Sequence, residues 1–152
     1  MMSQKNFLPV LYELARAYQA FEMYSASHVR LLGLTASQFD IIATLGNTEG
    51  MSFKELGEKS LITKGTLTGV VDRLEAKKLV KRVACPKDGR RQYVQLTKAG
   101  EAMFDRVFPE HGDYLAQVFS GFKQQELDKA EAVLKQLKLA FQAADLNIEE
   151  AA

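Results

Sequence analysis

Basic side chains gather in the stretch CPKDGRRQYVQLTKAG, which spans residues 85–100. Arginine guanidinium groups bind phosphate oxygens and fit into a narrow DNA minor groove, where the potential is most negative. A carboxylate beside them can hold an arginine in place through a charge-assisted hydrogen bond. The stretch therefore predicts an anion-binding loop in which Arg90 and Arg91 enter a minor groove. In this loop Asp88 would position an arginine, and Lys87 would add a phosphate contact.

The net charge of +1 conceals an uneven distribution of charge along the chain. Residues 1–51 carry a net charge of −1, residues 52–100 carry +7 and residues 101–152 carry −5. Because salt screens charges over short distances, a basic middle segment acts as a local field. This distribution favours a nucleic acid as the partner of the middle segment. Taken alone, a basic loop is more often a solvated surface, so the neighbouring elements decide between these two interpretations.

A second group of candidate residues lies on a predicted helix, TKGTLTGVVDRLEAKK, residues 63–78. Its apolar positions recur at helical spacing and predict one buried face. The positions off that face are small, hydroxylated or basic: Thr63, Lys64, Gly65, Thr66, Thr68, Gly69 and Arg73. Threonine and basic side chains bind phosphates and base edges, so these positions predict a DNA-reading surface. Each glycine costs about 0.8–1 kcal/mol of helix stability against alanine, which either close approach to DNA or packing against another helix would explain.

The elements that must position these residues form a helix-turn-helix followed by a hairpin. Ser52 and Thr63 are expected to cap two consecutive short helices, and the second helix of such a pair offers its N-terminal turns to a groove. The expected elements are helices 7–32, 35–46, 52–60 and 63–78, strands 79–85 and 91–96, a helix from Thr97 to about residue 120, and a last helix that ends near residue 146. The sequence predicts a mainly α protein, a winged helix-turn-helix with a small β-hairpin wing between long N- and C-terminal helices.

Composition argues against several other classes of protein. The chain has 152 residues, enough to bury a core without disulfides or a metal. One cysteine and two histidines, His28 and His111, supply neither a disulfide nor a zinc ligand set, and His111 near Asp113 is expected to be exposed. We find no catalytic residue, metal site or cofactor motif and expect no enzyme. We find no signal peptide or membrane segment and expect a cytoplasmic protein without membrane contacts.

Two segments make the chain resemble the MarR family of winged-helix transcription regulators. DGRRQYVQLTKAG is similar to the family's Asp-x-Arg hairpin that leads into Leu-Thr-x-x-Gly. VVDRLEAKKLVKR is similar to the family's recognition helix and the residues that follow it. The resemblance implies that Asp88 braces the loop, that Arg90 enters the minor groove and that residues 63–73 lie in the major groove.

The resemblance also implies how the chain is organised. It implies a single domain over residues 1–152, made of a DNA-binding lobe (34–100) and a helical dimerisation region (1–33 and 101–147). The terminal helices carry more apolar side chains than one small lobe can cover, which favours a homodimer on double-stranded DNA. The implied function is that of a homodimeric repressor bound to an inverted-repeat operator. A winged-helix module that binds a protein partner instead of DNA is the alternative.

Members of the family often bind small aromatic or amphipathic anions in a crevice between the dimer helices and the DNA-binding lobe. The residues that could line such a crevice lie on the first helix and are Arg16, Tyr18, Tyr24 and His28. Ordinary packing and surface roles are the alternative for these side chains. The sequence therefore leaves a small-molecule effector open.

The chain departs from the family pattern at two positions. Lys78 stands where the family usually has glycine after the recognition helix, so a non-glycine residue is expected to carry the left-handed cap. Cys85 lies beside the hairpin loop, whereas redox-sensing members place their reactive cysteine near the start of the first helix. We therefore expect Cys85 to be an inert small hydrophobe and not a thiol switch.

Overall fold

The structure, a computed structural model, describes residues 6–85 and 87–151. Contacts within the chain define two compact units, one that ends at Tyr114 and one that begins at Leu115. Pro86, which belongs to the predicted hairpin loop, lies outside the described residues. The single-domain organisation stays a prediction.

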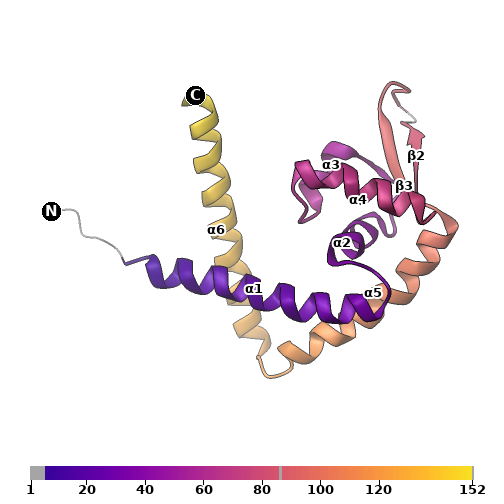
Figure 1. Ribbon diagram of the computed structural model, residues 1–152. Helices are drawn as coiled ribbons and strands as arrows, with labels where there is room; N and C mark the ends of the chain where they lie inside the picture. The colour runs from indigo at the N-terminus through magenta and orange to yellow at the C-terminus, as the bar shows by residue number, and fades with distance from the viewer. Residues whose placement is uncertain (1–5, 86, 152) are drawn as a thin grey trace. The chain divides into compact units, whose positions relative to one another are not determined.

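The first unit holds the predicted helix-turn-helix and hairpin (Figure 1). Its elements are α1 (Leu8–Leu31), α2 (Ala36–Leu45), β1 (Met51–Ser52), α3 (Phe53–Lys59), α4 (Lys64–Ala76), β2 (Val80–Ala84), β3 (Gln92–Leu96) and the larger part of α5 (Lys98–Phe119). Their order confirms the predicted succession of helices and strands. The short strand β1 is an addition that the sequence pattern did not predict.

Capping hydrogen bonds explain where the first helices of the lobe begin. α2 begins at a capping box, in which the Thr35 hydroxyl accepts from the Gln38 amide and the Gln38 side chain accepts from the Thr35 amide, each at 3.1 Å. The Ser52 hydroxyl caps α3 by accepting a backbone amide at 3.1 Å. Thr63 makes no side-chain cap on α4, so that prediction is wrong. Its hydroxyl lies instead 3.0 Å from the hydroxyl of Thr66.

α4 ends at a left-handed residue that carries a side chain. Lys78 has φ 62°, which confirms the prediction for this position. Its amide donates to the carbonyl of Glu75 at 2.9 Å, and the amide of Leu79 donates to the carbonyl of Leu74 at 3.0 Å. These two bonds satisfy carbonyls that the helix end leaves open and turn the chain into β2. A β-carbon in this conformation costs about 1–2 kcal/mol, so the tight turn is retained against a local penalty.

The hairpin belongs to a three-stranded antiparallel sheet in the order β1-β3-β2. Val80 pairs with Leu96 at the base of the hairpin, and Ala84 pairs with Gln92 nearer the loop. Met51 of β1 pairs with Val94 on the other edge of β3. Because β3 has a partner on each side, the hairpin is attached to the lobe through backbone hydrogen bonds as well as side chains.

Thr97 joins three elements at the base of the hairpin. Its hydroxyl donates to the carbonyl of Lys78 at 2.6 Å and accepts from the amide of Gly100 at 3.1 Å. Its own amide donates to the carbonyl of Leu79 at 3.0 Å. The predicted cap of α5 is therefore confirmed, and the same residue holds the end of β3 against the end of α4.

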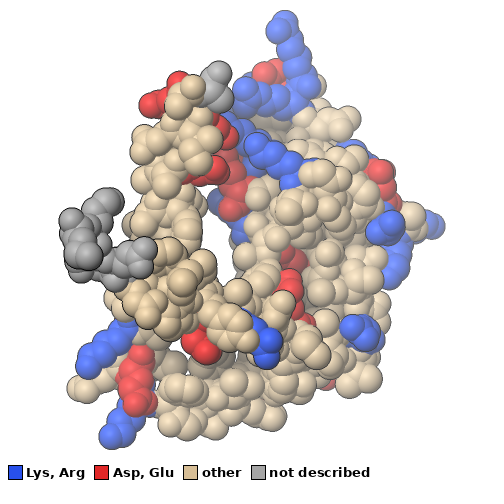
Figure 2. Space-filling view, turned by 60° about the vertical axis from the view of Figure 1, so that its left-hand side comes forward, with Lys and Arg blue, Asp and Glu red and all other residues tan. Residues whose placement is uncertain are grey.

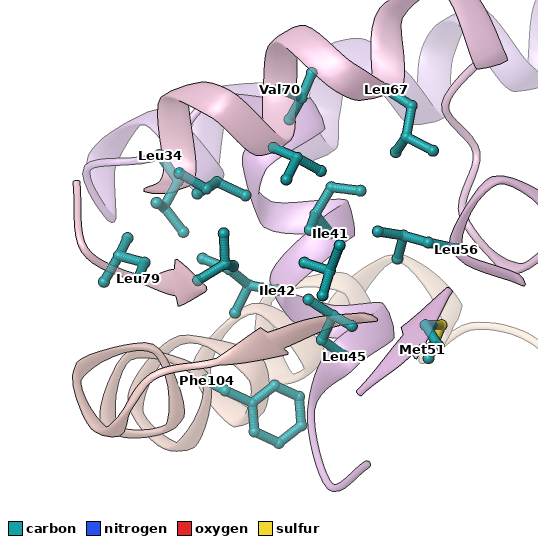
Figure 3. Packing of buried hydrophobic residues seen from close by; sticks show 14 of the residues in the cluster. Leu34, Ile41, Ile42, Leu45, Met51, Leu56, Leu67, Val70, Leu79 and Phe104 are labelled. Carbon is teal, nitrogen blue, oxygen red and sulfur yellow. The ribbon is translucent and has the colours of Figure 1, made fainter. Parts of the chain in front are cut away.

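The core of the first unit is built around α2 (Figure 3). Ile41, Ile42 and Leu45 project from α2 toward side chains of α4 on one side and of α5 on the other. Gly46, directly after α2, lies against the ring of Phe104, where any β-carbon would collide with the ring. This close approach requires glycine at the end of α2 and seats α5 against the lobe.

The second unit consists of the end of α5 and the helix α6 (Gln124–Ala151). α6 begins after Lys123, whose amide donates to the carboxylate of Glu126 at 2.8 Å. It continues to Ala151, past the predicted end near residue 146, because glutamate and alanine favour helix. No residue of α6 is buried, although it carries several large apolar side chains.

Candidate nucleic-acid interface

α4 exposes the residues that the sequence predicted to read DNA. Its apolar residues Leu67, Val70, Val71 and Leu74 are buried, which turns the intervening positions outward. All seven predicted positions are exposed, with Thr63 directly before α4 and six on the helix: Lys64, Gly65, Thr66, Thr68, Gly69 and Arg73. The first turn of α4 holds no acidic residue, and a helix N-terminus attracts anions through its free amides and its dipole. Binding of DNA by these particular residues stays a prediction.

Gly65 and Gly69 have open space around them. A β-carbon built at either position meets no neighbouring atom of the described chain within 4 Å. Packing of these glycines against another helix of the same chain is therefore wrong as an explanation. α4 thus carries two residues that each weaken it by about 0.8–1 kcal/mol without a packing gain inside the chain. This leaves the close approach of another molecule as the interpretation.

Asp88 organises the hairpin loop. Its Oδ1 accepts the backbone amide of Arg90 at 3.1 Å, and its carbonyl accepts the amide of Arg91 at 3.0 Å. Its Oδ2 lies 4.0 Å from Nε of Arg91, too far for the predicted charge-assisted hydrogen bond. Asp88 therefore braces the loop mainly through the backbone, and the side chains of Lys87, Arg90 and Arg91 are exposed.

The basic side chains of this loop are exposed where the hairpin turns. Figure 2 shows Lys and Arg side chains at the top of the view, the height at which Figure 1 draws the tip of the β2–β3 hairpin. The exposed loop residues 87–91 comprise one lysine, two arginines, one aspartate and one glycine. A projecting cationic loop of this kind can reach a phosphate backbone or a minor groove beyond the helix.

Arg82 of β2 ties the hairpin to α4. Its Nη2 lies 2.5 Å from Oδ1 of Asp72, and its Nη1 lies 2.7 Å from Oε1 of Glu75. Its guanidinium carbon also lies 5.5 Å from the ring centroid of Phe53 in α3. The planar guanidinium suits two carboxylates at once, which the flexible ammonium of lysine does not. Arg82 is thus a positioning residue whose charge is balanced within the lobe.

Cys85 lies at the base of the loop, directly after β2. Its side chain is buried and carries a free thiol. A hydrogen bond from the backbone amide of Lys87 lowers the pKa of this thiol, while burial acts in the opposite direction. Burial agrees with the inert residue that the sequence predicted, whereas the lowered pKa increases the thiolate fraction. The prediction of an inert thiol stays untested.

The structure brings together two of the four residues that were predicted to line a crevice. Tyr24 and His28 of α1 both stack on Tyr114 of α5, with ring centroids 4.2 Å from it in each case. The hydroxyl of Tyr24 also donates to the carbonyl of Tyr114 at 3.1 Å. These contacts build an aromatic cluster between α1 and α5 within the first unit.

The other two predicted crevice residues make different contacts. The guanidinium carbon of Arg16 lies 5.6 Å from the ring centroid of Tyr12, one turn earlier on α1. The ring of Tyr18 lies 6.3 Å from that of Phe21. Both contacts are local to α1 and do not involve the aromatic cluster. An effector site formed by all four residues stays a prediction.

His111 extends the aromatic cluster and was missed as a member of it. Its Nδ1 lies 2.9 Å from Nδ1 of His28, a residue 83 positions away in sequence, and its Nε2 lies 2.9 Å from the hydroxyl of Ser25. The ring of Phe39 meets it edge-on at 4.6 Å. His111 is only 3% exposed, so the expectation of an exposed histidine is wrong. Burial, and then the charge of His28, lower the pKa of His111.

The helical periodicity of α5 contained the signal for this burial. His111 follows Phe104 by seven residues and Val107 by four, and both of these are buried. Residues at such spacing share one face of a helix, so His111 falls on the apolar stripe. Proximity to Asp113 in sequence is no sign of exposure, because residues two apart do not share a helix face, and Asp113 itself is exposed.

The first unit combines two short consecutive helices, an exposed polar face on the second helix and a basic antiparallel hairpin after it. This combination defines a winged-helix DNA-binding protein. Residues 32–91 match the model of the MarR family. Two relatives in Bacillus subtilis (strain 168) are the HTH-type transcriptional regulator MhqR, 29% identical over 91% of this chain and 94% of its own, and the uncharacterized HTH-type transcriptional regulator YsmB, 30% identical over 69% and 72%. This chain belongs to the MarR family of winged-helix transcription regulators.

A solved structure agrees with this assignment. The structure of BpsR from Bordetella bronchiseptica, whose DNA binding is regulated by 6-hydroxynicotinic acid, matches with a TM-score of 0.77. The two chains are 26% identical, and the match covers 88% of this chain and 95% of BpsR. Family and relatives are DNA-binding transcription regulators and not enzymes, which confirms the predicted family and fold class.

In residues 6–85 and 87–151, no helix combines the length and the apolar character that crossing a bilayer requires. The same part of the chain holds no cluster of three or more His, Cys, Asp or Glu side chains that could share a metal ion.

Proposed function

We propose that this protein is a homodimeric repressor that binds an inverted-repeat operator through α4 and the hairpin loop. The observation that carries this proposal is the exposed N-terminal half of α4. It presents hydroxyls, one lysine and two unpacked glycines, and it holds no acidic side chain. The two carboxylates farther along α4, Asp72 and Glu75, are engaged by Arg82. A surface of this composition suits close contact with a polyanion.

Unpartnered apolar surface supports the dimer. α6 has 28 residues, of which none is buried, and it exposes Val133, Leu134, Leu139 and Phe141 among others. α1 likewise exposes Leu8, Leu11, Tyr12 and Phe21. Amphipathic helices gain most of their stability by burying an apolar stripe, so a partner that covers these faces would stabilise both helices. A twofold copy would place two α4 helices about 34 Å apart, one turn of DNA.

A small aromatic or amphipathic anion is the effector that we propose for this repressor. The relative BpsR, whose DNA binding responds to 6-hydroxynicotinic acid, supports this class of ligand. The stacked rings of Tyr24, His28 and Tyr114 join α1 to α5 and would transmit a change between these helices. A ligand can only shift such an arrangement by binding one conformation better than another.

A DNA-shift titration at several salt concentrations, combined with a measurement of molecular mass, tests the core of the proposal. The DNA is the region upstream of the protein's own gene. We expect a dimer in solution and a logarithm of affinity that falls linearly with the logarithm of salt concentration. A winged-helix module that binds a protein partner would show little salt-dependent affinity for this DNA. That result would replace the proposed function with the alternative.

Arg90 offers a sharper test of the hairpin loop. Removing its charge in Arg90→Ala should weaken operator binding and reduce the salt slope by about one unit for each bound protomer, because one positive charge that displaces counterions from the DNA is lost. The dimer should persist. Lys135→Ala, which removes a charge from α6 instead, should leave the slope unchanged. An Arg90→Ala protein with the slope of the wild type would remove this arginine from the interface.

A further inference from the structure

Leu61 is an unusual side chain in the DNA-binding lobe. It is 68% exposed, and among the described residues between 34 and 100 it is the one large hydrophobic side chain exposed to solvent. All other exposed large hydrophobic side chains of the described chain lie in residues 7–31 or 108–148. Those lie in or directly beside the long helices for which a second copy of the chain is the proposed partner. Leu61 lies outside these helices and needs a different explanation.

The backbone at Leu61 is held firmly in place. Its amide donates to Oδ2 of Asp40 in α2 at 2.7 Å, a short bond to a charged acceptor. The next residue, Ile62, is partly buried and packs against the core. Its amide also lies 3.4 Å from the hydroxyl of Ser60. The exposure of Leu61 therefore belongs to an anchored turn and not to a loose one.

The turn that carries Leu61 leads directly into the predicted DNA-reading surface. Leu61 lies two residues before Thr63, and the residues from Thr63 to Thr66 are all exposed. In a helix-turn-helix, this end of the second helix enters the major groove. The only large apolar group that base pairs offer in that groove is the 5-methyl group of thymine. An anchored, exposed leucine among hydroxyls and a lysine has this methyl group as its natural partner.

We propose that Leu61 packs against the 5-methyl group of a thymine in each operator half-site and thereby selects thymine at that position. The proposal rests on the proposed operator binding and adds a residue and a base to it. Burial of one methyl group changes an equilibrium constant by about fourfold. The contact carries no charge, so it should contribute to base preference and not to the salt dependence of binding.

The test uses the full-length protein and a duplex obtained from random DNA by repeated selection for binding. Each thymine of the selected duplex is replaced in turn by uracil, which removes the methyl group and keeps the base pair. For the wild type we expect one replacement per half-site to weaken binding by about fourfold for each methyl group lost. For Leu61→Ala, the same replacement should have no effect, since the partner of the methyl group is gone.

Two controls separate this contact from others. Leu61→Ala should keep the melting temperature and the salt slope of the wild type, because an exposed uncharged side chain has been shortened. Thr66→Ser removes a methyl group from α4 but keeps the hydroxyl, and it should leave the uracil effect at the Leu61 position intact. If Leu61→Ala still responds to every uracil replacement as the wild type does, the contact is wrong while operator binding stands. If selection yields no bound duplex, operator binding is wrong and the contact with it.

Discussion

At Gly69, the stability of α4 and the approach of another molecule to α4 should respond in opposite ways to one substitution. Its surroundings are empty within the described chain, so Gly69→Ala meets no obstacle. We expect the free energy of unfolding to rise by about 0.8–1 kcal/mol, the usual gain of alanine over glycine inside a helix. Operator affinity should fall, because the added methyl group holds DNA away from the helix. Urea denaturation and a DNA titration measure the two effects.

Gly112 supplies the matched control for this substitution. It lies inside α5 and also has no neighbouring atom within 4 Å of a built β-carbon. Gly112→Ala should stabilise the protein by a similar amount and leave operator affinity unchanged. Tight operator binding by Gly69→Ala would show that α4 does not approach DNA at this position.

At the scale of elements, the link between α4 and the hairpin depends on Arg82. Arg82→Lys keeps the charge but loses the planar fork that binds Asp72 and Glu75 together. We expect weaker operator binding with an unchanged salt slope, because the positions of helix and hairpin relax while no phosphate contact is removed. The loss of stability should stay within about 1 kcal/mol, since both carboxylates are partly exposed.

The salt slope distinguishes this positioning role from direct contact with DNA. If Arg82 bound phosphate, Arg82→Ala would lower the slope by about one unit for each protomer. Lysine would then largely restore it, because lysine also neutralises phosphate. A salt slope that falls in Arg82→Ala and recovers in Arg82→Lys would contradict the positioning role.

The contact between α1 and α5 should make stability depend on pH. The pKa of His111 lies below its ordinary value in the folded protein because of burial and the charge of His28. As pH falls below about 6.5, the unfolded chain takes up a proton at this residue that the folded chain resists. The contribution of His111 to the free energy of unfolding should therefore be fully present above pH 6.5 and decrease as the pH is lowered toward 5.5. Urea denaturation over this range measures the decrease.

The geometry of the two histidines gives this prediction a spectroscopic control. With Nδ1 atoms 2.9 Å apart, one proton fits between the rings, and a second would face the first. Since the chain has only two histidines, the His111→Gln variant keeps a single imidazole and assigns the two sets of resonances by difference. His111→Gln, which cannot titrate, should reduce the pH dependence of stability. An identical dependence in this variant would assign the effect to other groups.

Sequence reasoning succeeded at the level of elements and was weaker for contacts between them. The periodic apolar residues, the Thr35–Gln38 capping box and the turn-rich loop sufficed for the helices and the hairpin, because these signals are local. β1 was not predicted because a strand of two residues has no periodicity, and its pairing with β3 is a tertiary contact. The partners of His111 and Arg82 lie on other elements and were equally out of reach. The outward face of α4 was predictable because burial of one helix face specifies the other.

At the scale of the whole molecule, the terminal helices should determine assembly. Deletion of residues 121–152 removes α6 and should produce monomeric or aggregated protein with poor operator binding. The reason is that α6 supplies apolar surface that the proposed dimer would bury.

Leu134→Glu is a milder change that places a charge on the exposed apolar stripe of α6. It should also shift the protein toward monomer, whereas Lys135→Glu beside it should not. Size-exclusion chromatography with light scattering measures the mass, and a dimeric deletion protein with full operator affinity would contradict this assignment.

The hydroxyl of Thr97 has a consequence for how members of this fold can diversify. It fixes the base of the hairpin to the end of α4, whereas beyond the Ala84–Gln92 pair the tip forms no part of that junction. Residues added in pairs at the tip preserve the alternation of faces along both strands. The hairpin can therefore become a longer arm that reaches a more distant stretch of the DNA backbone, while the position and orientation of α4 stay the same.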